Sequence, residues 1–368
     1  MSDRKYRPVY MFIFMGLMLM VIMMNYSFNL IYYIQNRIYE NAVKTLFPVE
    51  TYFEDNYDEN AGSVWVDSEY MFSMAEEDKK PATQTDEGVV EAGAAVCPWP
   101  LQENAAGNVY NIADLKNYDF LMKFYTVTSI TSLTTQIMRP EEFLAKDLSL
   151  EKNADLPQIL IFHTHSQEGF VDTVEGDTST TIVGVGDYLT DILTNTYGYN
   201  VYHDTSVYDY VDGKLDRSKA YTYAEENVAK ILEENPSIEV VIDLHRDGVA
   251  DTTHLVTEVD GKSMAKVMFF NGLSYSKVNG DIAYLYNPYR DDNLAMSLQM
   301  QLLGEAYYPG FLRRIYINAY RYCLHERGRS MLIEAGAQTN TFEEVKNAME
   351  PLADILDKML SGEKVIGD

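Results

Sequence analysis

The chain has few cysteines and few positive charges, and each shortage excludes a class of function. Cys97 and Cys323 are its two cysteines, and no C-x-x-C pair exists, so a zinc site would have to use histidine and carboxylate ligands. Against 56 acidic residues stand 29 lysines and arginines, which gives a net charge of −27 at pH 7. This charge argues against nucleic acid or anionic lipid headgroups as partners, because their phosphates would be repelled.

The chain also lacks the motifs of several large enzyme classes. It contains no G-x-S-x-G elbow, no Walker loop and no repeat of fixed period. His245, Arg246 and Asp247 spell the H-R-D of protein kinases, but the glycine-rich loop and the D-F-G that a kinase needs do not accompany them. These absences exclude a protein kinase.

The N-terminal 47 residues are predicted to form a cytoplasmic stub and a membrane anchor. Residues 1–8 carry three basic side chains, and Val9 to Ile34 is almost entirely apolar. A bilayer-spanning helix needs roughly 20 apolar residues, and a preceding positive cluster favours a cytoplasmic N-terminus. A signal peptide would have a shorter apolar run followed by a small-residue cleavage site, which is not found here, so we expect an uncleaved transmembrane helix.

Residues 48–107 are acidic and of low complexity, with sequences such as EDNYDEN, AEEDKK and TQTDEG. Such a segment buries too little apolar surface to fold alone. We interpret it as a flexible linker, with an acidic docking tail as the alternative. Residues 108–368 would then form an extracytoplasmic catalytic domain.

From Pro157 onward, strand-like and helix-like patterns alternate. This alternation predicts an α/β fold with a mixed, largely parallel sheet flanked by helices. The predicted strands are Ile159–Phe162, Asn200–His203, Glu239–Leu244, Val267–Asn271, Arg313–Ile317 and Met331–Glu334. The predicted helices are Val185–Thr196, Tyr221–Glu234, Asp291–Ala306 and Thr341–Leu360, with Gly198 ending the first and a cap at Asn340-Thr341 opening the last.

A cluster of metal-capable side chains follows the first of these strands. His163 and His165 are separated by one residue, so in an extended strand they would project to the same side. Glu168 comes three positions later, where the strand should already be turning. Imidazole and carboxylate are the usual zinc ligands outside cysteine sites, and three of them are enough for a catalytic centre.

Two other predicted strands also end at an imidazole or a carboxylate side chain. Ile238 to His245 is an apolar run that ends on a histidine, followed by Arg246, and the run from Ser330 reaches Glu334 before a small-residue turn. Functional groups in open α/β sheets gather outside the carboxyl ends of the strands. Strands far apart in sequence can therefore bring these groups together, although the spacing alone names no reaction.

At these residues the chain resembles the stage II sporulation protein P family, which comprises membrane-anchored cell-wall hydrolases of endospore-forming bacteria. The matching pieces are the anchor, the FYTV segment near Phe124, HTHSQEGF, DLHRDG and LIEAGAQTNTFEEV. HTHSQEGF and DLHRDG together are specific to the family, whereas either one alone would be weak. Gly169 is a departure, because serine or alanine is expected there.

The family is similar to zinc-dependent N-acetylmuramoyl-L-alanine amidases, and this likeness implies a fold, a cofactor and roles for residues. Zn²⁺ would be held by His163 or His165, by Glu168 and by His245. Glu334 would be the catalytic carboxylate, and Arg246 would help to stabilise the oxyanion. The resemblance implies cleavage of the amide between muramic acid and L-alanine, and also endopeptidase action on peptide cross-links.

The resemblance further implies a place and partners for the protein. It suggests engulfment during sporulation, in the mother-cell membrane, together with a membrane-bound lytic transglycosylase and a multi-pass membrane protein. Two alternatives stay open at this point. One is a carboxypeptidase-like zinc hydrolase whose pocket would use Arg313, Arg314, Arg327 and Arg329. The other is a non-catalytic wall-binding scaffold, which predicts a missing ligand, yet all are present.

Overall fold

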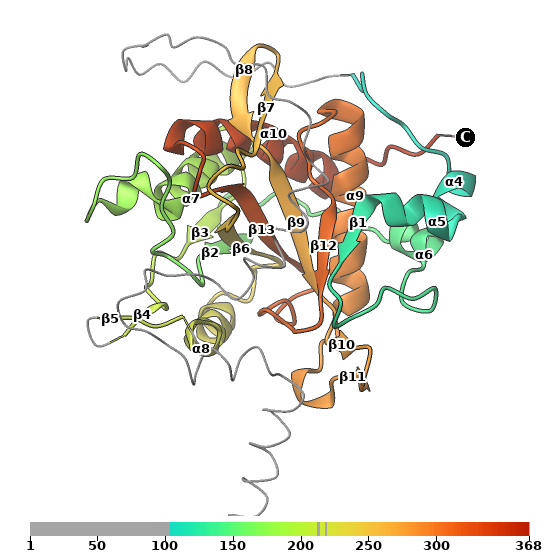
Figure 1. Ribbon diagram of the computed structural model, residues 1–368, viewed down its shortest axis with the longest axis horizontal. Helices are drawn as coiled ribbons and strands as arrows, with labels where there is room; N and C mark the ends of the chain where they lie inside the picture. The colour runs from blue at the N-terminus through green and yellow to red at the C-terminus, as the bar shows by residue number, and fades with distance from the viewer. Residues whose placement is uncertain (1–103, 212–213, 218, 368) are drawn as a thin grey trace, which may run out of the picture. The chain divides into compact units, whose positions relative to one another are not determined.

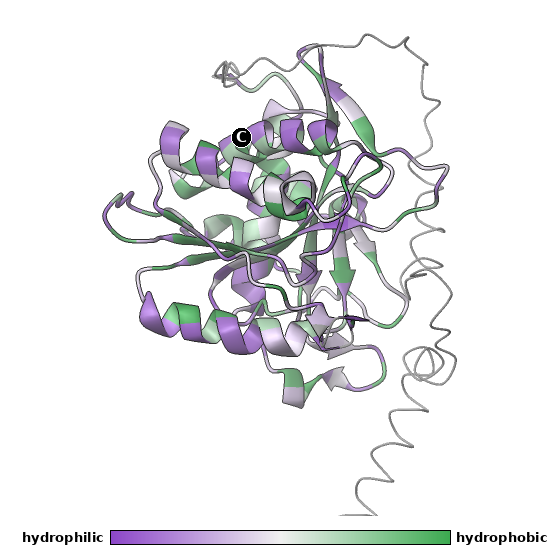
Figure 2. Cartoon of the chain, turned by 90° about the vertical axis from the view of Figure 1, so that its left-hand side faces the viewer, coloured by the Kyte–Doolittle hydropathy of each residue, from purple (hydrophilic) through white to green (hydrophobic). Residues whose placement is uncertain are grey.

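A computed structural model of the protein describes residues 104–211, 214–217 and 219–367. In this part of the chain, one large sheet lies between helices on its two faces (Figures 1 and 2). The predicted membrane anchor and most of the predicted acidic linker lie outside the described residues. Among the helices that are described, none combines the length and the apolar character needed to cross a bilayer.

Seven strands of the described region form the central sheet, and each neighbouring pair except one is parallel. In order across the sheet they are β1 (Tyr125–Val127), β12 (Ile315–Asn318), β9 (Val267–Gly272), β13 (Arg329–Ala337), β6 (Val240–Asp247), β2 (Ile159–Phe162) and β3 (Val201–His203). The exception is β9 against β13, which is antiparallel. The prediction of an α/β fold with a mixed, largely parallel sheet is confirmed.

Helices and small hairpins precede, connect and follow these strands in the described region. The helices are α4 (Ile112–Lys116), α5 (Tyr118–Leu121), η1 (Met122–Phe124), α6 (Pro140–Ala145), η2 (Thr178–Thr180), α7 (Ile182–Asp191), η3 (Ile192–Thr196), α8 (Ala220–Glu234), η4 (Ala283–Leu285), α9 (Arg290–Tyr307) and α10 (Phe342–Leu360). The hairpins pair β4 (Tyr210–Val211) with β5 (Lys214–Leu215), β7 (Val256–Val259) with β8 (Lys262–Ala265), and β10 (Tyr275–Ser276) with β11 (Gly280–Asp281).

Strand β2 shows how the sequence builds the three layers. All four of its residues are buried, as expected for a strand that is covered on both faces. Because side chains alternate along a strand, Ile159 and Ile161 pack in the larger core with α7, α9 and α10, whereas Leu160 and Phe162 pack with α8. Helix α8 is the helix below the sheet in Figure 2, and its buried residues recur at helical spacing toward the sheet.

The last helix begins where the sequence predicted a cap. Thr341 is the N-cap of α10, and its side chain accepts a hydrogen bond from the backbone N–H of Glu344, while the Glu344 carboxylate accepts one from the Thr341 N–H. This reciprocal arrangement satisfies two backbone donors that the helix itself cannot satisfy. It sets the start of a helix whose buried face supports β13 and β8.

We expect Thr341→Ala to lower the free energy of unfolding by about 1 kcal/mol, because one N-terminal donor of α10 loses its acceptor. Denaturant-induced unfolding followed by circular dichroism would measure the change. Thr341→Ser keeps the hydroxyl and should retain most of the stability. Equal midpoints for the alanine variant and the wild type would show that this cap contributes nothing.

Some boundaries differ from the sequence-based prediction. The predicted helix Val185–Thr196 begins three residues earlier, at Ile182, and its final five residues form the π-helical turn η3. Gly198 follows at φ 79° and ends it, as predicted. The hairpin β7–β8 was not predicted, because its half-exposed residues lack a strong apolar alternation.

Candidate metal centre

Three neighbouring strands bring the predicted groups together. β2, β6 and β13 lie side by side and run in the same direction, so their carboxyl ends meet at one edge of the sheet. Glu334 of β13 is the direct register partner of His245 of β6. Partners in adjacent parallel strands share a face, so these two side chains lie on the same side of the sheet.

His165, Glu168 and His245 form a compact group of potential ligands. One ligand atom from each lies within 4.8 Å of the others. His165 Nδ1 is 3.6 Å from Glu168 Oε1, and His245 Nδ1 is 3.5 Å from Glu168 Oε2. Ligands at 2.0–2.1 Å from a tetrahedral zinc ion would be about 3.4 Å apart, and each histidine lies near this distance from a different oxygen of Glu168. Two imidazoles and a carboxylate are also a donor set that zinc uses.

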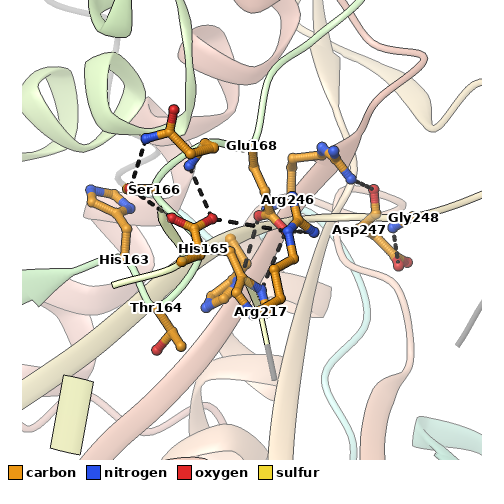
Figure 3. A network of polar contacts seen from close by, with 12 residues as sticks. His163, Thr164, His165, Ser166, Glu168, Arg217, Arg246, Asp247 and Gly248 are labelled. Carbon is orange, nitrogen blue, oxygen red and sulfur yellow. Dashed lines mark hydrogen bonds and ion pairs between the residues drawn. The ribbon is translucent and has the colours of Figure 1, made fainter. Parts of the chain in front are cut away.

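The two histidines that follow β2 have different neighbours, because they do not lie in an extended strand. β2 ends at Phe162 and the chain turns over residues 164–167, so the period-two alternation of a strand no longer applies. Only His165 joins the group with Glu168 and His245. His163 lies apart from them (Figure 3).

His163 is fully buried, and both of its ring nitrogens are engaged by the protein. Nδ1 lies 2.7 Å from the carbonyl oxygen of Leu244, and since a carbonyl can only accept, Nδ1 donates. Nε2 lies 2.9 Å from Nε2 of His203, whose Nδ1 is 2.9 Å from Asp187 Oδ1. A β-carbon at Gly186 would meet both imidazoles at 2.7 Å, which explains a glycine there. In this arrangement both ring nitrogens of His163 have protein partners.

Asp243 is a functional candidate that the sequence analysis did not identify. It is buried in β6, and its Oδ1 accepts a hydrogen bond of 2.7 Å from His245 Nε2, which orients Nδ1 toward Glu168. The same carboxylate accepts bonds from the backbone N–H and hydroxyl of Thr164, at 2.9 and 2.6 Å. A carboxylate behind a histidine ligand is common in metal sites. The available signal was its position two residues before His245 in a strand, and therefore on the same face.

We expect Asp243→Asn to weaken zinc binding by about 10–100-fold, because His245 loses the negative partner that fixes its orientation. Competition with a chromophoric chelator would measure the dissociation constant. Asp354→Asn is a suitable control, since Asp354 is also a buried carboxylate but lies on α10, bonded to Tyr308. Unchanged zinc affinity in the Asp243 variant would contradict the orienting role.

The electrostatics of the group favour cation binding. Burial raises the pKa of Glu168, but Arg246 and the two histidines outweigh it and hold that pKa well below the ordinary value, so the carboxylate is ionised. Burial lowers the pKa of His165, which keeps this imidazole neutral and its lone pair available. For His245, burial acts to lower the pKa, yet Asp243 and Glu168 raise it well above the usual value. These two carboxylates favour a positive charge at this ring, and a metal ion would have to take the place of the ring proton.

Glu334 has a buried carboxylate oxygen, Oε2, without a hydrogen-bond partner among the described residues. Burial, followed by the charge of Asp247, raises the pKa of Glu334 well above its ordinary value. A buried, unpaired carboxylate oxygen calls for an explanation, and a site for a substrate or an ion provides one.

Two arginines border the group (Figure 3). The backbone N–H of Arg246 donates to Glu168 Oε2 at 3.0 Å, and its side chain donates to the carbonyls of Gly169 and Asp247, at 3.0 and 3.2 Å. Arg217, which the sequence analysis did not single out, places Nη1 3.7 Å from Glu168 Oε1. In this structure Arg246 therefore holds the loop after Glu168.

Three of the four arginines that an alternative carboxypeptidase-like pocket would use have other partners. Arg313 pairs with the buried Asp247 at 2.6 Å. Arg327 donates to the carbonyls of Ile238 and Glu326, and Arg329 to those of Leu148 and Ser149 and to the carboxylate of Glu239. No observation thus favours a pocket for a free substrate carboxylate built from these side chains.

The remaining histidines lie in other surroundings. His254 is half exposed and contacts Glu344 at 2.9 Å. His325 lies near Glu225 and Glu326, and their ligand atoms fall within 4.8 Å of one another. There Arg321 Nη2 already contacts both oxygens of Glu225, at 2.6 and 2.7 Å, which compensates the negative charge.

Comparison with known proteins identifies the family. The sequence profile of stage II sporulation protein P (SpoIIP) matches residues 54–357. The chain belongs to the SpoIIP family. The resemblance that was inferred from HTHSQEGF and DLHRDG is thereby confirmed, and all the predicted site residues fall inside the matched range.

One curated relative of this SpoIIP-family chain has low sequence identity to it. Stage II sporulation protein P of Bacillus subtilis (strain 168) is 24% identical over 232 residues, which cover 58% of this chain and 54% of that protein. The match thus spans about half the length of that relative.

Among solved structures, two similar ones are amidases. The first is the CwlD amidase of Clostridioides difficile in complex with the GerS lipoprotein, with a TM-score of 0.36, 17% identity, and coverage of 56% of this chain and 100% of that one. The second is the catalytic domain of CwlV, an N-acetylmuramoyl-L-alanine amidase of Bacillus (Paenibacillus) polymyxa var. colistinus, with a TM-score of 0.33, 13% identity, and coverage of 56% and 98%.

Proposed function

We propose that this SpoIIP-family chain is a zinc-dependent peptidoglycan hydrolase that cleaves the amide between muramic acid and L-alanine. The observation that carries the proposal is the group His165, Glu168 and His245, whose ligand atoms lie within 4.8 Å of one another. Glu334, whose Oε2 has no partner among the described residues, is the register partner of His245. Two imidazoles and one carboxylate would supply the three protein ligands that catalytic zinc sites use.

Each residue of the group has a task in amide hydrolysis. His165, Glu168 and His245 would hold the ion, and Asp243 keeps His245 in the binding orientation. Zinc, when bound, polarises the amide carbonyl and lowers the pKa of water. Glu334 takes a proton from the attacking water and delivers it to the leaving amine. Arg246 keeps Glu168 in place through its backbone N–H, and an additional role at the oxyanion is part of the proposal.

We further propose a location and biological setting. The apolar segment Val9–Ile34 anchors the chain in the membrane, residues 48–107 act as a linker, and residues 108–368 form the extracytoplasmic catalytic domain. Membership of the SpoIIP family supports a role in sporulation, and we propose that the role is engulfment from the mother-cell membrane. A membrane-bound lytic transglycosylase and a multi-pass membrane protein are the proposed partners.

Digestion of purified peptidoglycan tests the activity. The full chain, kept in detergent, should release stem peptides that begin with a free L-alanine, and mass spectrometry would identify them. A chelator should abolish the release, and added zinc should restore it. Loss of cross-linked fragments would reveal endopeptidase action as well. Intact sacculi in the presence of zinc would contradict the proposed hydrolase.

A further inference from the structure

Asp209 is a fully buried carboxylate beside the candidate metal centre, and the proposed reaction does not use it. It lies directly before β4. Its Oδ1 accepts a hydrogen bond of 3.1 Å from the Ser166 hydroxyl, and its Oδ2 accepts one of 3.3 Å from the backbone N–H of Gln167. A buried charge is costly unless such bonds compensate for it, so the choice of these two partners matters.

The two donors are the residues that separate His165 from Glu168. This turn therefore carries two of the three potential ligands, and its own backbone bond, from Glu168 N–H to the His165 carbonyl, is long at 3.4 Å. The turn is held mainly from outside. Asp243 binds its beginning at Thr164, and Asp209 binds its middle.

Asp209 also lies near the guanidinium of Arg217, which would compete with a metal ion for the carboxylate of Glu168. Arg217 Nε lies 3.9 Å from Asp209 Oδ2, and Arg217 Nη1 lies 3.7 Å from Glu168 Oε1. Without the charge of Asp209, the guanidinium would be drawn more strongly toward Glu168, where it would oppose a metal ion. Asp209 thus acts on the ligand group both through the turn and through Arg217.

We propose that Asp209 is a positioning residue for the metal centre, which holds the turn between His165 and Glu168 so that both can bind one ion. The proposal rests on the proposed function, because it concerns the affinity of the same site. The residue acts through the turn and through Arg217, and not by contact with the ion.

Zinc affinity of the full chain in detergent tests this role independently of activity. We expect Asp209→Ala to weaken zinc binding by about 10–100-fold in competition with a chromophoric chelator. Asp204→Ala is the matched control. Asp204 is buried in the same connection between β3 and α8, but it accepts bonds from Ser206 and Tyr208, away from the turn. Its zinc affinity should stay close to that of the wild type.

Each outcome decides a separate question. Unchanged affinity in folded Asp209→Ala, or an equal loss in Asp204→Ala, would overturn the positioning role. If Asp209→Ala does not fold, Ser166→Ala removes one of the two bonds, and unchanged zinc affinity in that variant would overturn the role as well. A wild-type chain that binds no zinc would refute the metal centre of the proposed function, and the positioning role would be refuted with it.

Discussion

Glu334→Gln should reduce the release of stem peptides from peptidoglycan by about 10²–10⁴-fold, because glutamine cannot take a proton from water or give one to the leaving amine. The change removes the ionisable carboxyl group but keeps the shape of a side chain whose Oε2 has no hydrogen-bond partner among the described residues. The fold and zinc binding should therefore survive. Initial rates of peptide release, measured with saturating zinc, would give the size of the loss.

Glu326→Gln is the matched control for Glu334→Gln. Glu326 is also a glutamate whose pKa burial raises, but it lies beside His325, outside the group that would hold the ion. We expect this variant to release peptides at a rate close to that of the wild type. Full activity in Glu334→Gln would refute the catalytic role of that carboxylate, and loss of bound zinc in it would indicate a ligand instead.

His165→Ala should remove zinc from the chain together with the hydrolase activity. One of the three protein ligands is lost, so the affinity should fall by more than the 10–100-fold that is expected for an orienting residue. Elemental analysis after gel filtration would report the zinc content, and peptide release would report the activity. Wild-type zinc content in His165→Ala would contradict the assignment of this histidine to the metal.

His163→Gln tests whether His163, in place of His165, is the metal ligand. His163 has both ring nitrogens bound, to the Leu244 carbonyl and to His203, so its replacement should leave the zinc content unchanged. Loss of zinc in this variant, with His165→Ala still loaded, would reverse the roles of the two histidines. A thermal melt of each variant would separate loss of fold from loss of metal.

Much of the fold could be predicted because it follows from local patterns. The run Ile159–Phe162 is apolar throughout, and it forms a strand that is buried on both faces. The cap at Thr341 also follows from adjacent residues. The hairpin β7–β8 escaped prediction because its pattern is weak, and it is stabilised by pairing between its strands and by packing against α10.

The amino-acid sequence alone was enough to indicate the family, the largely parallel sheet and the strand ends followed by candidate groups, since these depend on short motifs and on periodicity. It left open which of His163 and His165 would be the ligand. Only the tertiary structure showed that His165 lies in the ligand group. The chain turns after Phe162, and beyond the end of a strand side chains no longer alternate between its two faces. The carboxylates of Asp243 and Asp209 could be recognised as candidates only from their long-range contacts. Both accept hydrogen bonds from the turn that carries two of the potential ligands. Such contacts join residues that are 42 to 79 positions apart, so they depend on the folded chain and not on a local sequence pattern.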